Sequence, residues 1–157
     1  MDGQKYIQLV SAFKCKDKLI MTSSVKVTEG LWYIHPPLEV IYTNATLLEI
    51  GKAVFDALGR SQIGFPAPPS SAEMGKAMNC LVKAVGVQTS DDILKVTLHC
   101  IVGRDTKGFE ITPTHIGGLN DVHFLLERRI MLEADVSPEQ LGTAFLQGFA
   151  ACTSIYE

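Results

Sequence analysis

The sequence has no excess of positive charge and no long apolar run. Among its 157 residues, 14 Lys and Arg face 17 Asp and Glu, and the formal net charge is −3. Proteins that bind nucleic acid directly usually present a strongly basic face, so this class is disfavoured. No stretch approaches the roughly 20 apolar residues of a membrane-spanning helix, and the amino end lacks the pattern of a signal peptide. We therefore expect a cytoplasmic protein that contacts neither membrane nor nucleic acid.

The sequence also lacks the common motifs of metal, nucleotide and hydrolase sites. Its four cysteines contain no C-x-x-C pair, which favours free and mostly buried thiols. Its four histidines form no i, i+4 pair and no H-E-x-x-H motif, so no metal site is indicated. The pairs Gly51-Lys52 and Gly75-Lys76 are followed by Ala, where a phosphate loop needs Ser or Thr. No serine lies in a G-x-S-x-G elbow. We expect no cofactor and no enzyme.

Two alternatives remain open. His99 and His123 lie in predicted strands, and on neighbouring strands their imidazoles would meet in a cleft suited to acid–base chemistry. The chain would then be a small enzyme or ligand-binding domain, and loss of turnover on changing His99 would support it. The other alternative is an adaptor that self-associates through an exposed sheet edge, which the oligomeric state in solution would test.

What the sequence does contain is one pattern written three times: Ser or Thr, two residues, Glu or Gln, a large apolar residue and Gly. The copies are TLLEIGKA from Thr46, SSAEMGKA from Ser70 and SPEQLGTA from Ser137. These are the components of helix capping, and apolar residues at helical spacing follow each copy. The pattern predicts helices at about 46–60, at 71–85 and from Ser137. A glycine inside a helix costs roughly 1 kcal/mol relative to alanine, which indicates close approach to a neighbouring element.

Between these helices apolar and polar residues alternate, which is typical of strands. Strands are predicted at 5–13 and 18–27 as an opening hairpin, through LWYIHPPLEVIY, at 93–103 and 109–116 as a second hairpin, and at 122–134. Neither Pro36 nor Pro37 has a backbone N–H to donate to a strand ladder, so their strand is either bent or partly at a sheet edge. The predicted fold class is α+β, a mostly antiparallel sheet with about three helices packed over one face. One domain, residues 1–157, is expected for this length.

Two segments share a strand, a polar turn and a capped helix. They begin at LEVIYTNATLLEIGKA and at RIMLEADVSPEQLGTA, and their capping residues Thr46 and Ser137 are 91 residues apart. One interpretation is pseudo-symmetry or a shared packing geometry. The other is independent convergence on a good helix start.

Acidic residues cluster near predicted loop ends, at Asp91-Asp92, Asp105, Glu110 and Glu133-Asp135. A solvated rim is the simpler interpretation. The functional interpretation is a patch that meets a basic protein, because complementary charge speeds encounter and fixes register. Trp32 likewise has two interpretations, a core anchor or an exposed binding anchor.

Residues 31–64, LWYIHPPLEVIYTNATLLEIGKAVFDALGRSQIG, resemble immunity proteins of bacterial contact-dependent growth inhibition (CDI) systems. The closing unit at 124–154 resembles them more weakly. The resemblance implies a small non-catalytic inhibitor that binds the toxic C-terminal domain of a large exported effector, often a nuclease, in a tight complex. It carries over no binding residue. On this hypothesis Asp91, Asp92, Asp105 and Glu110 bind the toxin by occluding a basic cleft.

Overall fold

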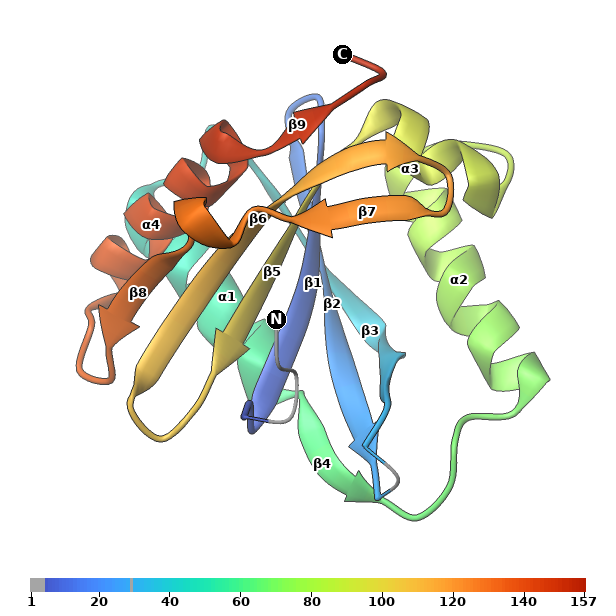
Figure 1. Cartoon of the computed structure of the whole chain (residues 1–157), viewed down its shortest axis with the longest axis horizontal. Helices are drawn as coiled ribbons and strands as arrows, with labels where there is room; N and C mark the ends of the chain where they lie inside the picture. Colours follow the sequence, from blue (N-terminus) through green and yellow to red (C-terminus); the bar gives the residue numbers. More distant parts are fainter. Residues whose placement is uncertain (1–4, 29) are drawn as a thin grey trace.

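The computed structural model describes residues 5–28 and 30–157 (Figure 1). The strands of this part are β1 (Gln8–Cys15), β2 (Lys18–Val27), β3 (Trp32–Tyr42), β4 (Gln62–Phe65), β5 (Leu98–Arg104), β6 (Gly108–Gly118), β7 (Asp121–Phe124), β8 (Ile130–Glu133) and β9 (Thr153–Ser154). Its helices are α1 (Leu47–Gly59), α2 (Ser71–Val85), α3 (Ile93–Val96) and α4 (Pro138–Ala151), with 3-10 turns η1 (Ser90–Asp92) and η2 (Leu126–Arg128). No helix in this part is long and apolar enough to cross a membrane. The predicted α+β class is confirmed.

The strands form one mostly antiparallel sheet in the order β3-β2-β1-β5-β6-β7. Both predicted hairpins are present, β1 with β2 and β5 with β6. Strand β3 lies at the edge, and its register shifts so that Thr22 pairs with Leu38 while Ser23 pairs with His35. Pro36 and Pro37 therefore fall outside the ladder, which confirms a bent edge strand. Strands β4 and β9, which pair in parallel with β2 and β6, were not predicted.

The three predicted helices begin where the capping pattern places them. Thr46, Ser70 and Ser137 are the N-caps of α1, α2 and α4, and each hydroxyl accepts from a backbone N–H of the first turn at 3.2 Å. Two capping boxes are complete, because Glu49 accepts from the N–H of Thr46 at 2.8 Å and Gln140 from that of Ser137 at 3.0 Å. These contacts are local, which is why the sequence predicts them well.

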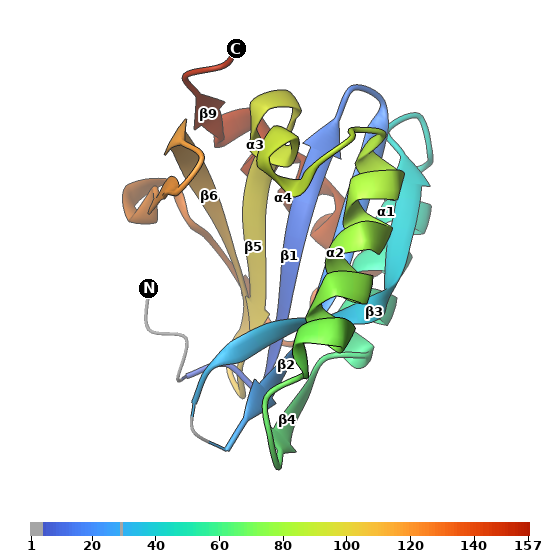
Figure 2. The same cartoon turned by 90° about the vertical axis from the view of Figure 1, so that its right-hand side faces the viewer.

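The helices cover both faces of the sheet, so the prediction of helices over one face is wrong. Figure 2 shows α2 in front of the sheet and α4 behind it. Helices α1 and α4 bury the main core, and α2 packs through Leu81 and Val85 on Phe13 and Ile20, which point to the opposite face. An amphipathic pattern shows that a helix buries one face, but not which side of the sheet receives it. Fully buried residues of the main core include Val10, Leu19, Met21, Ile50, Val54, Val102, Ile111, Leu141 and Phe145.

Helices α1 and α4 cross at two of the repeated glycines. A Cβ atom on Gly51 would overlap the carbonyl oxygen of Pro138, and one on Gly142 would overlap that of Leu47. The two strand-and-helix units thus share a packing geometry, in which each glycine admits the partner helix backbone. The expectation fails for Gly75, because a Cβ there would meet no atom within 4 Å.

Two predicted strands are interrupted. Residues Ile93–Val96 form α3 instead of the start of β5, because Ile93 is buried beside α2 and the Thr97 hydroxyl donates to the Ile93 carbonyl at 2.8 Å. The strand predicted at 122–134 is divided into β7 and β8, which pair with different parts of β6. Between them η2 leaves the ladder, and Arg128 donates to the carbonyl of Ala151 at 3.1 Å.

The four cysteines and Trp32 differ in how deeply they are buried. All four cysteines are free, but Cys80 on α2 is exposed whereas the other three are buried. The ring of Trp32 packs against a small buried cluster of Tyr6, Leu9 and Ile101. Trp32 is half-buried and also lines a groove with Met74 and Met78, so it fits neither the core-anchor nor the exposed-anchor interpretation alone.

Candidate protein-interaction site

The four predicted toxin-binding residues lie at opposite ends of β5. Asp91 and Asp92 belong to η1, which leads through α3 into the first residue of β5. Asp105 directly follows the last residue of β5, and Glu110 lies on the adjoining β6. Seven residues of strand span about 20 Å. Figure 1 shows α3 and the β5–β6 turn at opposite ends of β5, so the structure does not bring the two pairs of residues together.

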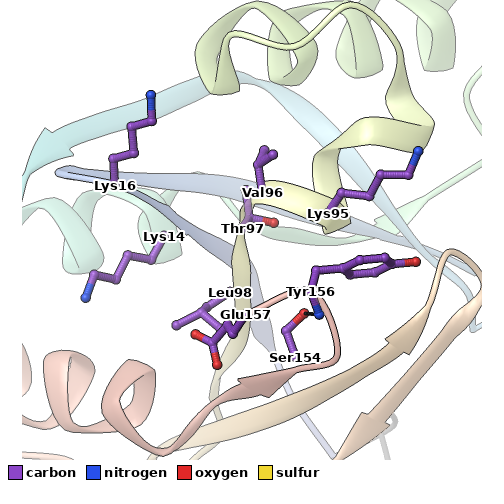
Figure 3. Close-up of a pocket in the computed structure, with 9 residues that line it drawn as sticks. All are labelled: Lys14, Lys16, Lys95, Val96, Thr97, Leu98, Ser154, Tyr156 and Glu157. Carbon is purple, nitrogen blue, oxygen red and sulfur yellow. Dashed lines mark hydrogen bonds between the residues drawn. The ribbon is translucent and has the colours of Figure 1, made fainter.

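The end that holds Asp91 and Asp92 carries charges of both signs. The Asp92 carboxylate accepts from the Thr89 hydroxyl at 3.0 Å and from Lys95 Nζ at 3.2 Å, and these contacts hold its pKa below the usual value. A hollow of about 250 Å³ beside it is lined by Lys14 at the end of β1, Lys16 in the following turn and Lys95 of α3 (Figure 3). Glu157 is the single acidic side chain among its described lining residues. Lys14 and Lys16 extend in different directions there, so the lysines do not converge on one ligand.

Glu110 is a buried ion-pair partner and not an exposed charge. It is 3% exposed, and its carboxylate lies 2.5 Å from Lys5 Nζ and 3.3 Å from the Thr112 hydroxyl. Burial raises the pKa of the Glu110 carboxyl, but Lys5 and the neighbouring Tyr6 hydroxyl lower it by more, so the net pKa lies below the usual value. Burial and the nearby Glu110 raise the pKa of Tyr6. Glu110 therefore has too little exposed surface to contact a partner directly.

Two adjoining hollows meet along β8. The first, of about 250 Å³, is lined by Asp105, Lys107 and Glu110 and by the β8 segment from Met131 to Glu133. The second, of about 350 Å³, shares that segment and adds Asp135, Val136 and Gln140. Met131 is 58% exposed between them. We define the β8 surface by six of the lining side chains that remain at least partly exposed here: Asp105, Lys107, Met131, Glu133, Asp135 and Val136.

Local structure holds this surface in place. The Asp105 carboxylate accepts from the backbone N–H groups of Lys107 at 2.7 Å and Gly108 at 3.0 Å, which fixes the β5–β6 turn. Strand β8 is paired with β6, so that Met131 lies opposite Glu110 and Glu133 opposite Gly108. The sequence shows Glu133-Asp135 as an acidic cluster, but it does not show that Glu133 lines the same hollow as Asp105.

The histidine pair of the enzyme hypothesis does not form. His99 Nδ1 lies 3.4 Å from the Thr114 hydroxyl, whereas His123 pairs with His115 across the β6–β7 ladder. Successive residues of a strand point to opposite faces, so Thr114 and His115 place the two histidines on opposite sides. Burial lowers the pKa of His99 to about 4, while His123 is exposed and lies 2.6 Å from Asp121. Among the described residues no three His, Cys, Asp or Glu side chains are grouped to hold a metal ion.

Comparison with known proteins identifies the family. The sequence model of the family described as CDI immunity protein matches residues 11–152. No curated protein matches the chain. The fold is similar to a protein of unknown function from Neisseria meningitidis, with a TM-score of 0.78, 15% identity, and coverage of 95% of this chain and 97% of that chain.

A second solved structure has the same fold. It is a CdiA-CT/CdiI toxin and immunity complex from Yersinia pseudotuberculosis, and the TM-score is 0.76 at 17% identity, with 92% of this chain and 97% of that chain covered. The family match begins within β1 and runs through α4. This chain belongs to the CDI immunity protein family.

Proposed function

We propose that this protein binds a cognate CDI toxin domain in the cytoplasm and neutralises it by forming a tight protein–protein complex. The observation that carries the proposal is the family match over residues 11–152. The similar fold from Yersinia pseudotuberculosis was solved as a toxin and immunity complex, which supports the same kind of partner. Such a complex needs no cofactor and no direct contact between this chain and nucleic acid.

The proposed mode of action is occlusion without catalysis. The geometry of the histidines supports it. His99 and His123 lie on opposite faces of the sheet, so they do not form a pair that could act together on one substrate. A nuclease toxin would carry a basic cleft for phosphate, and an acidic face of this protein would occupy that cleft in place of the phosphates.

The predicted acidic residues have different parts in this proposal. Asp105 contacts the toxin directly. Glu110 lines the same hollow but is buried in an ion pair with Lys5, so it supports the hollow without contacting the toxin. Asp91 and Asp92 lie at the other end of β5, beside Lys95. They contribute to the long-range attraction of a basic partner.

The test is reconstitution with the toxin domain encoded beside this protein. The two purified proteins are mixed at micromolar concentration and separated by size-exclusion chromatography, and toxin activity is assayed with and without this protein. We expect a stable complex in which activity is abolished. A toxin domain from a different CDI system serves as the control and should remain active. Separate elution of the cognate pair with undiminished toxin activity would reject the proposal. The elution volume of this protein alone tests self-association.

A further inference from the structure

We infer that the cognate toxin docks on the β8 surface, and that the docking segment of the toxin carries Lys or Arg side chains around an apolar residue. This inference rests on the proposed function and adds a location and a partner chemistry to it. It follows from the shape, the apolar centre and the uncompensated charge of this surface.

The centre of the β8 surface is apolar and accessible. Met131 is 58% exposed and lies where the two hollows meet, with Val136 beside it. A methionine side chain is unbranched and polarisable, so it adapts to the shape of a partner. Protein interfaces combine an apolar centre with a polar rim. The β8 surface has this arrangement before any partner binds.

The rim is acidic and not neutralised from within the described part of the chain. Asp105, Glu133 and Asp135 surround Met131, and Lys107 is the one cationic side chain among the described residues that line the hollows. Neither Glu133 nor Asp135 forms an ion pair with any other residue that the structure describes. Cationic side chains of a partner would therefore form ion pairs with these carboxylates without first breaking an existing ion pair.

The other hollows fit a basic partner less well. The hollow beside α3 is lined by Lys14, Lys16 and Lys95, which have the wrong sign, and Lys95 already pairs with Asp92. The groove between β3 and α2 is lined by apolar side chains such as Met74 and Met78, and its described lining residues include no charge to select a partner. Only the β8 surface, among these three, combines apolar area with negative charge.

The first test compares two charge reversals of equal size. The dissociation constant for the cognate toxin domain is measured for the wild-type protein, for E133K/D135K and for the matched control D91K/D92K. We expect E133K/D135K to weaken binding by about tenfold or more and the control by no more than about threefold. Equal losses for both variants, or unchanged affinity for E133K/D135K, would overturn the inference. If the wild-type protein itself does not bind, the proposed function fails and the inference fails with it.

A second test does not depend on charged variants folding correctly. Hydrogen exchange of the wild-type protein is measured with and without the toxin domain. We expect new protection of amides in residues 130–136 and at the β5–β6 turn. M131A should fold normally, because its side chain is exposed, and should weaken binding by about fivefold. Protection confined to residues 90–98, or full affinity of M131A together with no protection at β8, would contradict docking here.

Discussion

At the scale of single residues, the structure separates carboxylates that look alike in the sequence. Asp105 and Glu110 lie close together at the β5–β6 hairpin, yet Asp105 fixes a turn at the surface while Glu110 is buried against Lys5. The sequence does not show this difference, because the partner of Glu110 is 105 residues away along the chain. A residue-level prediction therefore tests the buried pair.

Glu110→Gln should lower the free energy of unfolding at neutral pH by about 2 kcal/mol, because a hydrogen bond to a charged group is lost and Lys5 keeps no counter-charge. The pKa of folded Glu110 is depressed, so the ionised carboxylate stabilises the fold above the unfolded value of about 4.3. That contribution disappears as pH falls through the folded pKa. Urea unfolding at neutral pH and at about pH 3 should therefore show a gap between wild type and variant that closes in acid.

The matched control for this prediction is Glu133→Gln. Glu133 is exposed and unpaired within the described chain, so its neutralisation should change stability by no more than about 0.5 kcal/mol. A loss for Glu110→Gln that is equally large at both pH values would show that packing, and not ionisation, accounts for the effect.

At the scale of the elements, the repeated glycines differ in their role. Two of them are needed for helix packing, whereas the third belongs only to the repeated helix start. Gly51→Ala or Gly142→Ala should lower the free energy of unfolding by about 3 kcal/mol, because each new Cβ overlaps a backbone carbonyl oxygen of the partner helix. Gly75→Ala should raise it by roughly 0.5–1 kcal/mol, because alanine favours a helix and no atom lies near its Cβ. Chemical unfolding of the three variants measures both signs, and a destabilising Gly75→Ala would refute this account.

The same elements show how far a sequence can predict such a fold. Helix starts are predictable because Thr46, Ser70 and Ser137 make their capping contacts within three residues. The side of the sheet that α2 covers depends on contacts with β1 and β2, which are distant in sequence. The candidate site is harder still, because it joins the β5–β6 turn to β8, and the alternation of residues 122–134 concealed the break that creates β8 as a separate strand.

At the scale of the whole molecule, charge is distributed unevenly about a net value of −3. The hollow beside α3 is lined by three lysines and Glu157, and Asp91 and Asp92 lie close by in η1, so opposite charges are balanced at that end. The β8 surface, at the other end of β5, has three carboxylates and one lysine. A molecule with this asymmetry orients in the field of a charged partner before contact. A basic toxin would therefore be drawn toward the β8 end.

This orientation predicts how association responds to salt. Raising the ionic strength from about 0.05 M to 0.5 M shortens the Debye length to a few ångströms, so the association rate constant for the cognate toxin should fall by about tenfold or more. The dissociation rate constant should change less, because contacts in the formed complex exclude solvent. Rapid-mixing measurements over this range test both rates, with E133K/D135K expected to give a flatter slope than D91K/D92K. An association rate that does not depend on salt would contradict steering by charge.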